Sequence, residues 1–196
     1  MIVGLTGGIG SGKTTIAQVL EVMGCIIYNS DERAKLMYFN TSVKTQIIQL
    51  LGNEAYLNNT TLNHTFISKK VFSNQDLLHK LNAIIHPAVK QDFITFKNNQ
   101  TPQKIIIKES ALLFETGIYK ELPFNILVTA PEPVRIQRVL NRSQISIDAI
   151  KQRMQAQWSD EEKTKLANFV IDNSGEKAVI PQLQACLHNI KKHVEA

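Results

Sequence analysis

Residues 7–14 read GGIGSGKT, a complete match to the phosphate-binding pattern G-x-x-x-x-G-K-[ST]. The apolar run Ile2–Thr6 precedes this motif, and a helical pattern over Lys13–Met23, closed by Gly24, follows it. The motif therefore has the strand, loop and helix context that a phosphate-binding loop requires. The alternative, a glycine-rich turn with a chance lysine, is disfavoured by the full match and by this placement.

The glycines of such a loop allow the backbone to turn so tightly that several N–H groups point into one concavity, and the helix N-terminus adds its partial positive charge. Lys13 is expected to neutralise the β- and γ-phosphates, which makes it a candidate catalytic residue, and the Thr14 hydroxyl is expected to ligate Mg²⁺. The residues predicted to bind ATP here are Gly10, Ser11, Gly12, Lys13, Thr14 and Thr15.

The remaining apolar runs predict a parallel sheet. They cover residues 25–28, 104–107, 125–129 and 169–171, and they are continuous rather than alternating. Continuous apolar strands are buried on both faces, which is typical of parallel α/β sheets, and we expect the first two strands to pair directly. The predicted fold class is an α/β P-loop three-layer sandwich with about five parallel strands, a helical acceptor-binding insertion and a small lid.

The insertion is predicted from the spacing of the strands. About 75 residues of mostly helical character separate the second strand from the third, which is too long for a simple crossover. We expect a single domain over residues 1–196, with its core in residues 1–30 and 103–196 and the insertion in about 31–102. Within the insertion, Pro87 predicts a helix break or a helix start.

Composition favours an ordinary globular protein in a reducing compartment, with 43% hydrophobic and 20% charged residues. Cys25 and Cys186 are far apart in the sequence and match neither a disulfide framework nor a zinc motif. The residues after Met1 lack a signal-peptide pattern, and no apolar stretch is long enough to span a bilayer. We expect a cytoplasmic protein without a membrane partner, as a monomer or a weak homo-oligomer.

Acidic residues that follow the predicted strands are candidate site residues, because the carboxyl ends of parallel strands line the ligand crevice. Asp31 is placed either to orient an acceptor hydroxyl and take its proton or to interact with a helix dipole. Glu109 either holds Mg²⁺ through water or is a surface acid paired with Lys108. Glu115 either caps the next helix or lines the acceptor pocket.

Three arginines, Arg135, Arg138 and Arg142, recur at i, i+3 and i+7 and share one face of a predicted helix. Guanidinium groups suit the spread charge of a transferring phosphoryl group, and a lid that carries them would close over bound nucleotide. The alternative is an amphipathic helix with a basic solvated side. His86, before Pro87, is either a hydrogen-bonded structural residue or a contact for a phosphate.

Further segments carry a resemblance to one family: Asn29-Ser30-Asp31, His86-Pro87, Leu112-Leu113-Phe114-Glu115, Gln137-Arg138 with Arg142, and Val170-Ile171-Asp172-Asn173 with Gly175. They match, in this order, the D-x-D position, the H-P element, the L-L-F-E segment, the arginine-bearing helix and the I-D-N-x-G segment of that family. On these residues and the phosphate loop, the sequence resembles the bacterial dephospho-CoA kinases over nearly its whole length.

The resemblance implies a helical acceptor domain over about residues 30–100 and a lid over about residues 140–155. It also implies transfer of the γ-phosphoryl group of ATP to the 3′-hydroxyl of dephospho-CoA, the last step of coenzyme A synthesis. By the family's roles, Asp31 is the catalytic base or hydroxyl orienter, Arg138 stabilises the transferring charge, and Arg142 and Asn173 lie near the adenine. Asp31, His86 and Glu115 are the candidates for contact with the acceptor.

Two positions depart from the family's pattern. Asn29 stands where the family more often has Asp, and Ala111 stands where it often has Pro. The loss of a carboxylate at position 29 weakens any role of that position in metal binding and transfers the role to Thr14 and Glu109.

Two other functions stay open at the level of the sequence. Another small-molecule or nucleoside-monophosphate-type kinase would share the phosphate loop, the insertion and the lid. A nucleotide-gated binding module on nucleic acid is the candidate outside enzymes, because the chain carries a net charge of +5. This excess is modest and unclustered along the chain, so we expect no nucleic-acid partner. A switch GTPase is disfavoured, since the guanine-reading N-K-x-D segment is absent.

Overall fold

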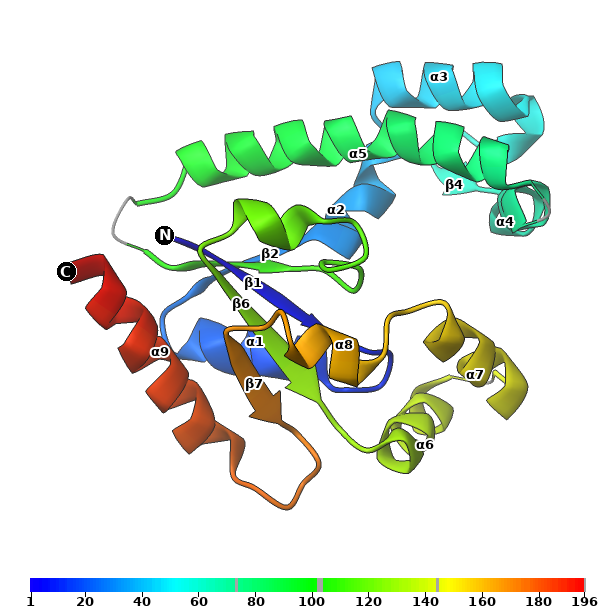
Figure 1. The fold of residues 1–196 in the computed structure, drawn as a ribbon. Coiled ribbons are helices and arrows are strands. Elements are labelled where there is room, and N and C mark those ends of the chain that lie inside the picture. The colour runs from blue at the N-terminus through cyan, green and yellow to red at the C-terminus, as the bar shows by residue number, and fades with distance from the viewer. Residues whose placement is uncertain (73, 102–103, 144, 196) are drawn as a thin grey trace. The chain divides into compact units, whose positions relative to one another are not determined.

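The computed structural model describes residues 1–72, 74–101, 104–143 and 145–195. The chain divides into two compact units (Figure 1), which are described separately below. The first unit consists of Met1–Asn29 and Thr101–Ala196, and the second consists of Ser30–Gln100. The second unit is therefore a single insertion in the sequence of the first.

The first unit is built on a five-stranded sheet in which every pairing is parallel. Its strands, in spatial order, are β2 (Ile26–Asn29), β5 (Ile106–Glu109), β1 (Ile2–Gly7), β6 (Phe124–Thr129) and β7 (Phe169–Asp172). The predicted parallel α/β sheet is thus confirmed. The predicted direct pairing of the first two strands is wrong, because β5 lies between β2 and β1 and pairs with both.

One face of this sheet is covered by α1 (Lys13–Val22) and α9 (Val179–Glu195), which lie beside the strands in Figure 1. Leu20 of α1 and Leu187 of α9 belong to the same buried cluster as Val3 and Leu5 of β1. Because these helices remove the apolar side chains of the strands from water, their burial drives the assembly of this layer.

The opposite face is covered by the turn that follows β5 and by the segments after β6. Leu113 and Phe114 of this turn are fully buried, and a Cβ on Gly4 of β1 would overlap the Leu113 side chain. The remaining elements of this unit are η2 (Ile118–Glu121), α6 (Glu132–Arg142), α7 (Ile147–Gln155) and α8 (Asp160–Thr164). The unit is therefore an α/β P-loop sandwich, as predicted.

Both cysteines are free and belong to the buried cluster that α1 and α9 form with the strands. Burial raises the pKa of Cys25, and it raises the pKa of Cys186 to about 12. Both thiols are therefore uncharged at neutral pH and act as small apolar side chains of the core.

The second unit is largely helical and has its own core. Its elements are α2 (Ser30–Met37), α3 (Thr41–Leu51), η1 (Asn53–Ala55), β3 (Tyr56–Asn58), β4 (Thr61–Leu62), α4 (His64–Phe72) and α5 (Gln75–Asn98). The long helix α5 contacts α2, α3 and α4, and its Leu81 and Ile85 are buried with Ile47 and Leu51 of α3. The helix α5 is therefore the central packing element of the unit.

Pro87 lies inside α5, so the predicted helix break or start at this residue is wrong. Proline lacks an N–H group and deprives the carbonyl of Ala83 of its intrahelical partner. Both Ala83 and Pro87 are exposed, so water can reach this carbonyl. The buried side chains of Leu81 and Ile85 hold the helix in place on the opposite side.

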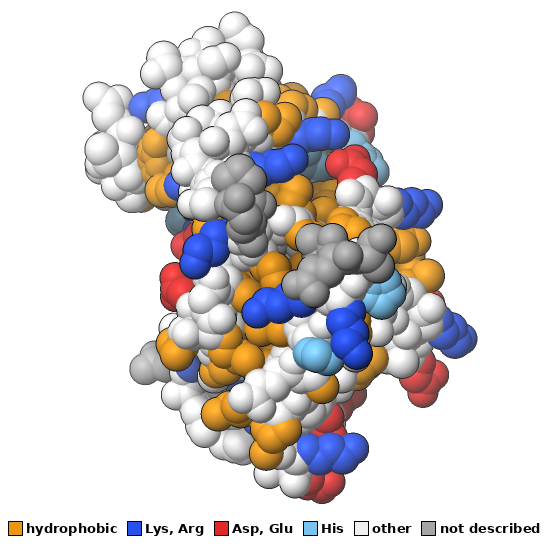
Figure 2. Space-filling model, turned by 90° about the vertical axis from the view of Figure 1, so that its left-hand side faces the viewer, with side chains coloured by type: hydrophobic (Ala, Val, Ile, Leu, Met, Phe, Trp, Pro, Cys, Tyr) orange, Lys and Arg blue, Asp and Glu red, His pale blue; other side chains and the backbone are white. Residues whose placement is uncertain are grey.

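Charged side chains are dispersed on the face of the molecule that Figure 2 shows, where lysine and arginine are interspersed with acidic and uncharged groups. The net charge of +5 is therefore not gathered into one continuous patch on this face. Among the described residues, no helix combines the length and the apolar character that crossing a membrane requires.

Candidate active site

The phosphate loop joins β1 to α1, with Gly12 as the residue before the helix. Gly12 has a φ of +90°, in the left-handed region, and a Cβ at this position would overlap the side-chain amide of Asn173. A residue with a side chain would therefore meet both backbone strain and a steric clash. The sequence requires glycine here because the loop packs closely against the segment after β7.

Gly12→Ala is expected to abolish measurable nucleotide binding, because the added methyl group displaces either the loop or Asn173. Gly24→Ala is the matched control, since Gly24 has a φ of +92° but, within the described residues and apart from its chain neighbours, no atom lies within 4 Å of its added Cβ. Both variants should lose about 1 to 2 kcal/mol of stability from the unfavourable φ, measured by urea unfolding. A Gly12→Ala protein that binds ATP as well as Gly24→Ala would contradict this account.

A cavity of about 500 Å³ lies over the phosphate loop. Its lining comprises Gly7, Gly8, Ile9, Gly10, Gly12, Lys13, Thr14, Thr15, Ala111, Leu112, Arg142, Arg153, Ala156 and Gln157. This volume lies within the range of small-molecule and cofactor sites. The predicted nucleotide contacts Lys13, Thr14, Thr15 and Arg142 thus surround one cavity, whereas Ser11 is buried beneath the loop.

Glu109 forms a polar cluster with the start of α1. Its Oε1 accepts a hydrogen bond from the Thr14 hydroxyl at 3.3 Å and lies 3.5 Å from Lys13 Nζ. Its Oε2 accepts a hydrogen bond from the amide of Asn29 at 3.1 Å. Glu109 is only 2% exposed, so the alternative of a surface acid is wrong. A buried carboxylate here is stabilised by the ammonium group and by both hydrogen bonds.

Arg138 and Asn173 hydrogen-bond to the backbone of the phosphate loop. The guanidinium group of Arg138 donates to the carbonyl of Ser11 at 3.3 Å and to that of Asn173 at 2.8 Å. The side-chain amide of Asn173 donates to the same Ser11 carbonyl at 2.7 Å. These bonds fix the backbone of the loop, and the predicted roles of Arg138 in charge stabilisation and of Asn173 near adenine stay predictions.

Asn173 is itself held by a tight turn. Asp172 accepts a hydrogen bond from the backbone N–H of Ser174 at 2.9 Å. Hydrogen bonds from Ser174 lower the pKa of the Asp172 carboxyl, so this group is ionised at neutral pH. Its contribution to stability is present above the ordinary pKa of 3.8 and is lost as the pH falls through the lowered value.

Arg135, like Arg138, binds a backbone carbonyl of the phosphate loop. Its Nε donates to the carbonyl of Ile9 at 3.0 Å, and its Nη1 pairs with Asp160 at 2.9 Å. Arg135 is 9% exposed, so a solvated basic side is wrong for this residue. Of the three arginines that share the predicted face, only Arg142 lines the cavity. Arg135 therefore supports the loop rather than facing a bound anion.

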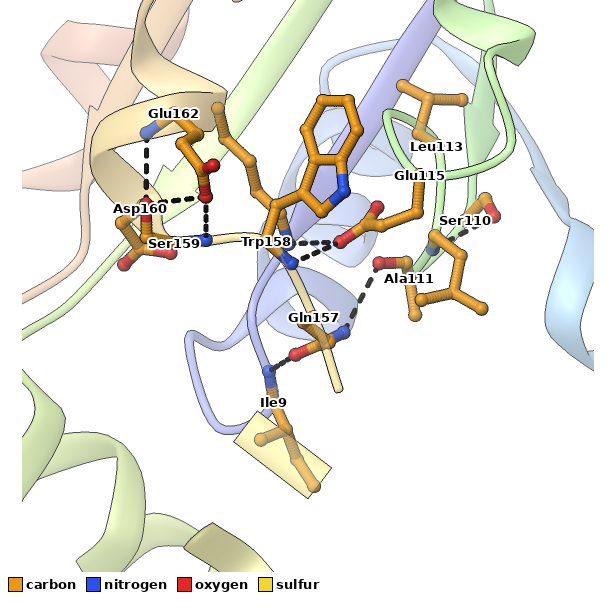
Figure 3. A network of polar contacts seen from close by, with 12 residues as sticks. Ile9, Ser110, Ala111, Leu113, Glu115, Gln157, Trp158, Ser159, Asp160 and Glu162 are labelled. Carbon is orange, nitrogen blue, oxygen red and sulfur yellow. Dashed lines mark hydrogen bonds and ion pairs between the residues drawn. The ribbon is translucent and has the colours of Figure 1, made fainter. Parts of the chain in front are cut away.

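Glu115 is paired with a lysine in the interior of the first unit. Its Oε1 lies 2.9 Å from Lys163 Nζ. The same oxygen accepts a hydrogen bond from the backbone N–H of Trp158 at 3.0 Å (Figure 3). The Lys163 side chain is fully buried. Glu115 caps no helix, because the next helical turn starts at Ile118 with Gly117 before it. Its predicted place in the acceptor pocket stays a prediction.

Glu115→Gln is expected to lower the free energy of unfolding by about 3 kcal/mol, because it removes the carboxylate that is paired with the buried ammonium of Lys163. Glu161→Gln, an exposed position on α8, is the control and should change stability by less than about 0.5 kcal/mol. Urea unfolding of the three proteins measures both values. Equal stability of the two variants would refute a structural role for the pair.

The other predicted site residues, Asp31 and His86, belong to the second unit. Asp31 is exposed in the first turn of α2, and His86 is exposed on α5. Arg33 Nε donates to Asp92 at 2.6 Å, which attaches α2 to α5 within this unit. This ion pair sets the orientation of the helix that carries Asp31, and the roles of Asp31 and His86 stay predictions.

Sequence reasoning missed two polar side chains of the cavity, Arg153 and Gln157. Arg153 falls within the predicted lid, and its position on the same short segment as Arg142 is a signal that could have found it. Gln157 follows α7, where neither periodicity nor charge distinguishes it from other surface glutamines. Only the fold shows that its amide reaches the phosphate loop.

Comparison with known proteins gives a consistent family. The model of the dephospho-CoA kinase family matches residues 1–178. A dephospho-CoA kinase from Bacteroides fragilis is 38% identical over 182 residues, which cover 92% of this chain and 88% of that protein. A crystal structure from Thermus thermophilus has a TM-score of 0.84 at 29% identity, with 98% and 97% of the two chains covered. A dephospho-CoA kinase from Campylobacter jejuni shares the fold, with a TM-score of 0.64 at 24% identity and coverage of 97% and 96%. The chain therefore belongs to the dephospho-CoA kinase family.

Proposed function

We propose that the chain transfers the γ-phosphoryl group of ATP to the ribose 3′-hydroxyl of dephospho-CoA, giving ADP and CoA. The observation that carries this proposal is the complete phosphate loop beneath a cavity of about 500 Å³, in a chain of this family. Phosphoryl transfer depends on positioning and on charge stabilisation more than on covalent chemistry. The loop, Lys13 and two arginines at the cavity supply both.

Lys13 and the amides at the start of α1 bind the phosphates of ATP. The Nζ of Lys13 is a point charge beside Glu109 at the cavity, and this position supports a contact with the β- and γ-phosphates. The backbone N–H groups of the first turn of α1 have no intrahelical partner and add the positive end of the helix dipole. These groups hold the nucleotide before transfer and stabilise the charge that develops during transfer.

The same cluster fits Mg²⁺. Thr14 and Glu109 place a hydroxyl and a carboxylate in hydrogen-bond contact at 3.3 Å, and such oxygen groups are the ligands that Mg²⁺ prefers. Thr14 would hold the ion directly and Glu109 would hold it through water. When bound, Mg²⁺ neutralises phosphate charge. The side-chain amide of Asn29 donates a hydrogen bond to Glu109, whereas the family's usual Asp at this position would repel that carboxylate. The hydrogen bond therefore helps to hold Glu109 at the cluster.

The lid and the acceptor side complete the mechanism. Arg142 of α6 and Arg153 of α7 line the cavity, and both guanidinium groups are exposed, so they are available to nucleotide phosphates or adenine. Asp31 orients the 3′-hydroxyl and takes its proton as the new bond to phosphorus forms. His86 and Glu115 contribute to binding of the acceptor. Asp31, His86, Glu115 and Arg142 each match a motif of the family, which supports these roles.

The test is an acceptor panel. Purified protein is incubated with Mg-ATP and either dephospho-CoA, AMP, CMP or shikimate, and ADP release is followed. We expect turnover with dephospho-CoA alone. Turnover with another acceptor would keep the kinase and overturn the proposed substrate. No turnover with any acceptor, together with salt-sensitive binding of nucleic acid, would favour a nucleotide-gated binding module.

A further inference from the structure

Gln157 makes two side-chain hydrogen bonds to backbone groups that are far away in the sequence. Its Oε1 accepts from the N–H of Ile9 in the phosphate loop at 2.9 Å, and its Nε2 donates to the carbonyl of Ala111 at 3.3 Å (Figure 3). The first bond spans 148 positions and the second spans 46. One side chain therefore connects the phosphate loop, the turn after β5 and the segment between α7 and α8.

The chemistry of this contact suits an amide. A backbone N–H needs an acceptor and a backbone carbonyl needs a donor, and the planar amide of Gln presents both side by side. Rotating the amide by 180° would place N–H against N–H and oxygen against oxygen, so the two partners fix its orientation. Met has a similar length but offers neither bond, which makes Gln157→Met the informative substitution.

The segment around Gln157 has a second link to Ile9. Arg135 donates to the Ile9 carbonyl at 3.0 Å and pairs with Asp160, three residues after Gln157. Both polar backbone groups of Ile9 are therefore bound by side chains that belong to, or pair with, residues 157–160. Trp158, between them, donates its backbone N–H to Glu115. A displacement of this segment must move Ile9 or break these bonds.

Gln157 and Ile9 both line the cavity over the phosphate loop, together with Arg153 and Ala156 from the end of α7. We propose that Gln157 is a positioning residue that couples α7 to the phosphate loop, so that nucleotide binding at the loop and the placement of α7 favour one another. It acts through Ile9 and Ala111 and takes no part in the transfer itself. This proposal rests on the proposed function because it assumes that the loop binds ATP, but it does not depend on which acceptor is phosphorylated.

Gln157→Met is expected to lower kcat/KM for ATP about tenfold, because it removes two partly buried hydrogen bonds, one of them to the loop that positions the nucleotide. The KM for ATP should rise, whereas the KM for dephospho-CoA should stay within about twofold of the wild type. Gln152→Met is the matched control, because Gln152 is exposed on α7 and its side chain makes no hydrogen bond within the described residues. This variant should behave like the wild type.

Fluorescence supplies a readout that does not depend on turnover. Trp158 is the single tryptophan of the chain and directly follows Gln157. A non-hydrolysable ATP analogue should change the Trp158 emission of the wild type and of Gln152→Met. In Gln157→Met, the change should be lost or should require about tenfold more analogue.

The kinetic and the fluorescence measurements together distinguish a failure of the coupling from a failure of the proposed acceptor. A fluorescence response that depends on Gln157, without turnover of dephospho-CoA, would support the coupling and refute the acceptor. A wild-type response and a wild-type KM for ATP in Gln157→Met would overturn the coupling. A fall in kcat that follows the folded fraction, with the KM for ATP unchanged, would also overturn it, because a merely structural residue behaves in that way.

Discussion

Lys13→Ala is expected to reduce turnover by at least about 10³-fold, because it removes the point charge that stabilises the phosphates during transfer. Lys13 lies at the cavity beside Glu109, and no other lysine lines that cavity in the described part of the chain. No second ammonium group among the described residues of the cavity lining can therefore replace that of Lys13. The fold should persist, since Glu109 keeps its hydrogen bonds to Thr14 and Asn29.

Single-turnover kinetics at saturating ATP and dephospho-CoA measure this loss, and circular dichroism with urea unfolding checks the fold. Lys97→Ala, at an exposed position of α5, is the control and should retain wild-type turnover. Retention of a near wild-type rate by Lys13→Ala would refute the phosphate-loop mechanism.

Asp31→Asn is expected to lower kcat by about 10² to 10³-fold with little change in the KM for ATP. The substitution keeps the size and hydrogen-bonding capacity of the side chain but removes its ability to take a proton. A base that acts on the acceptor hydroxyl contributes to the transition state, so its loss appears in kcat. Steady-state kinetics with each substrate varied in turn measure this separation.

Glu32→Gln is the control for the alternative role of Asp31 in the helix dipole. Both carboxylates lie in the first turn of α2 and are exposed, so a dipole effect would be similar for the two. Equal kinetics of the two variants would therefore reduce Asp31 to a structural residue. A matching loss of ATP affinity in Asp31→Asn would instead indicate a role in metal binding.

Local signals in the sequence predicted most of the first unit. The strand before GGIGSGKT and the helix after it are confirmed as β1 and α1, because the motif constrains its own flanks. The start of α8 has the sequence pattern S-x-x-E of a capping box, and the side chains of Ser159 and Glu162 each bond the backbone of the other residue there. The family resemblance is confirmed by the family model and by the curated relatives.

Long-range pairing could not be predicted from local signals. The position of β5 between β2 and β1 depends on a strand that returns after the inserted unit, and nothing in the first 30 residues records it. Arg135 shows the same limit in the site, because helical spacing placed it on the face of Arg138 and Arg142. Only the packed structure reveals that Asp160 and the Ile9 carbonyl bind it.

The sequence predicted which polar residues lie together at the phosphate loop best where a residue type is itself diagnostic. Lys13 and Thr14 follow from the motif, and Glu109 follows from an acid at a strand end, which the structure places in one cluster. Gln157 was missed because a neutral amide has no such signature. Its importance arises from two backbone partners at sequence distances that no periodic pattern encodes.

The identity of the reaction product tests the central claim most directly. Mg-ATP and dephospho-CoA are incubated with the protein, and the product is examined by mass spectrometry and by phosphorus NMR, with ADP measured in parallel. The account predicts one added phosphoryl group, carried as a monoester on the ribose 3′-hydroxyl, and one ADP for each CoA formed. Unchanged dephospho-CoA, or phosphate attached at another hydroxyl, would contradict it.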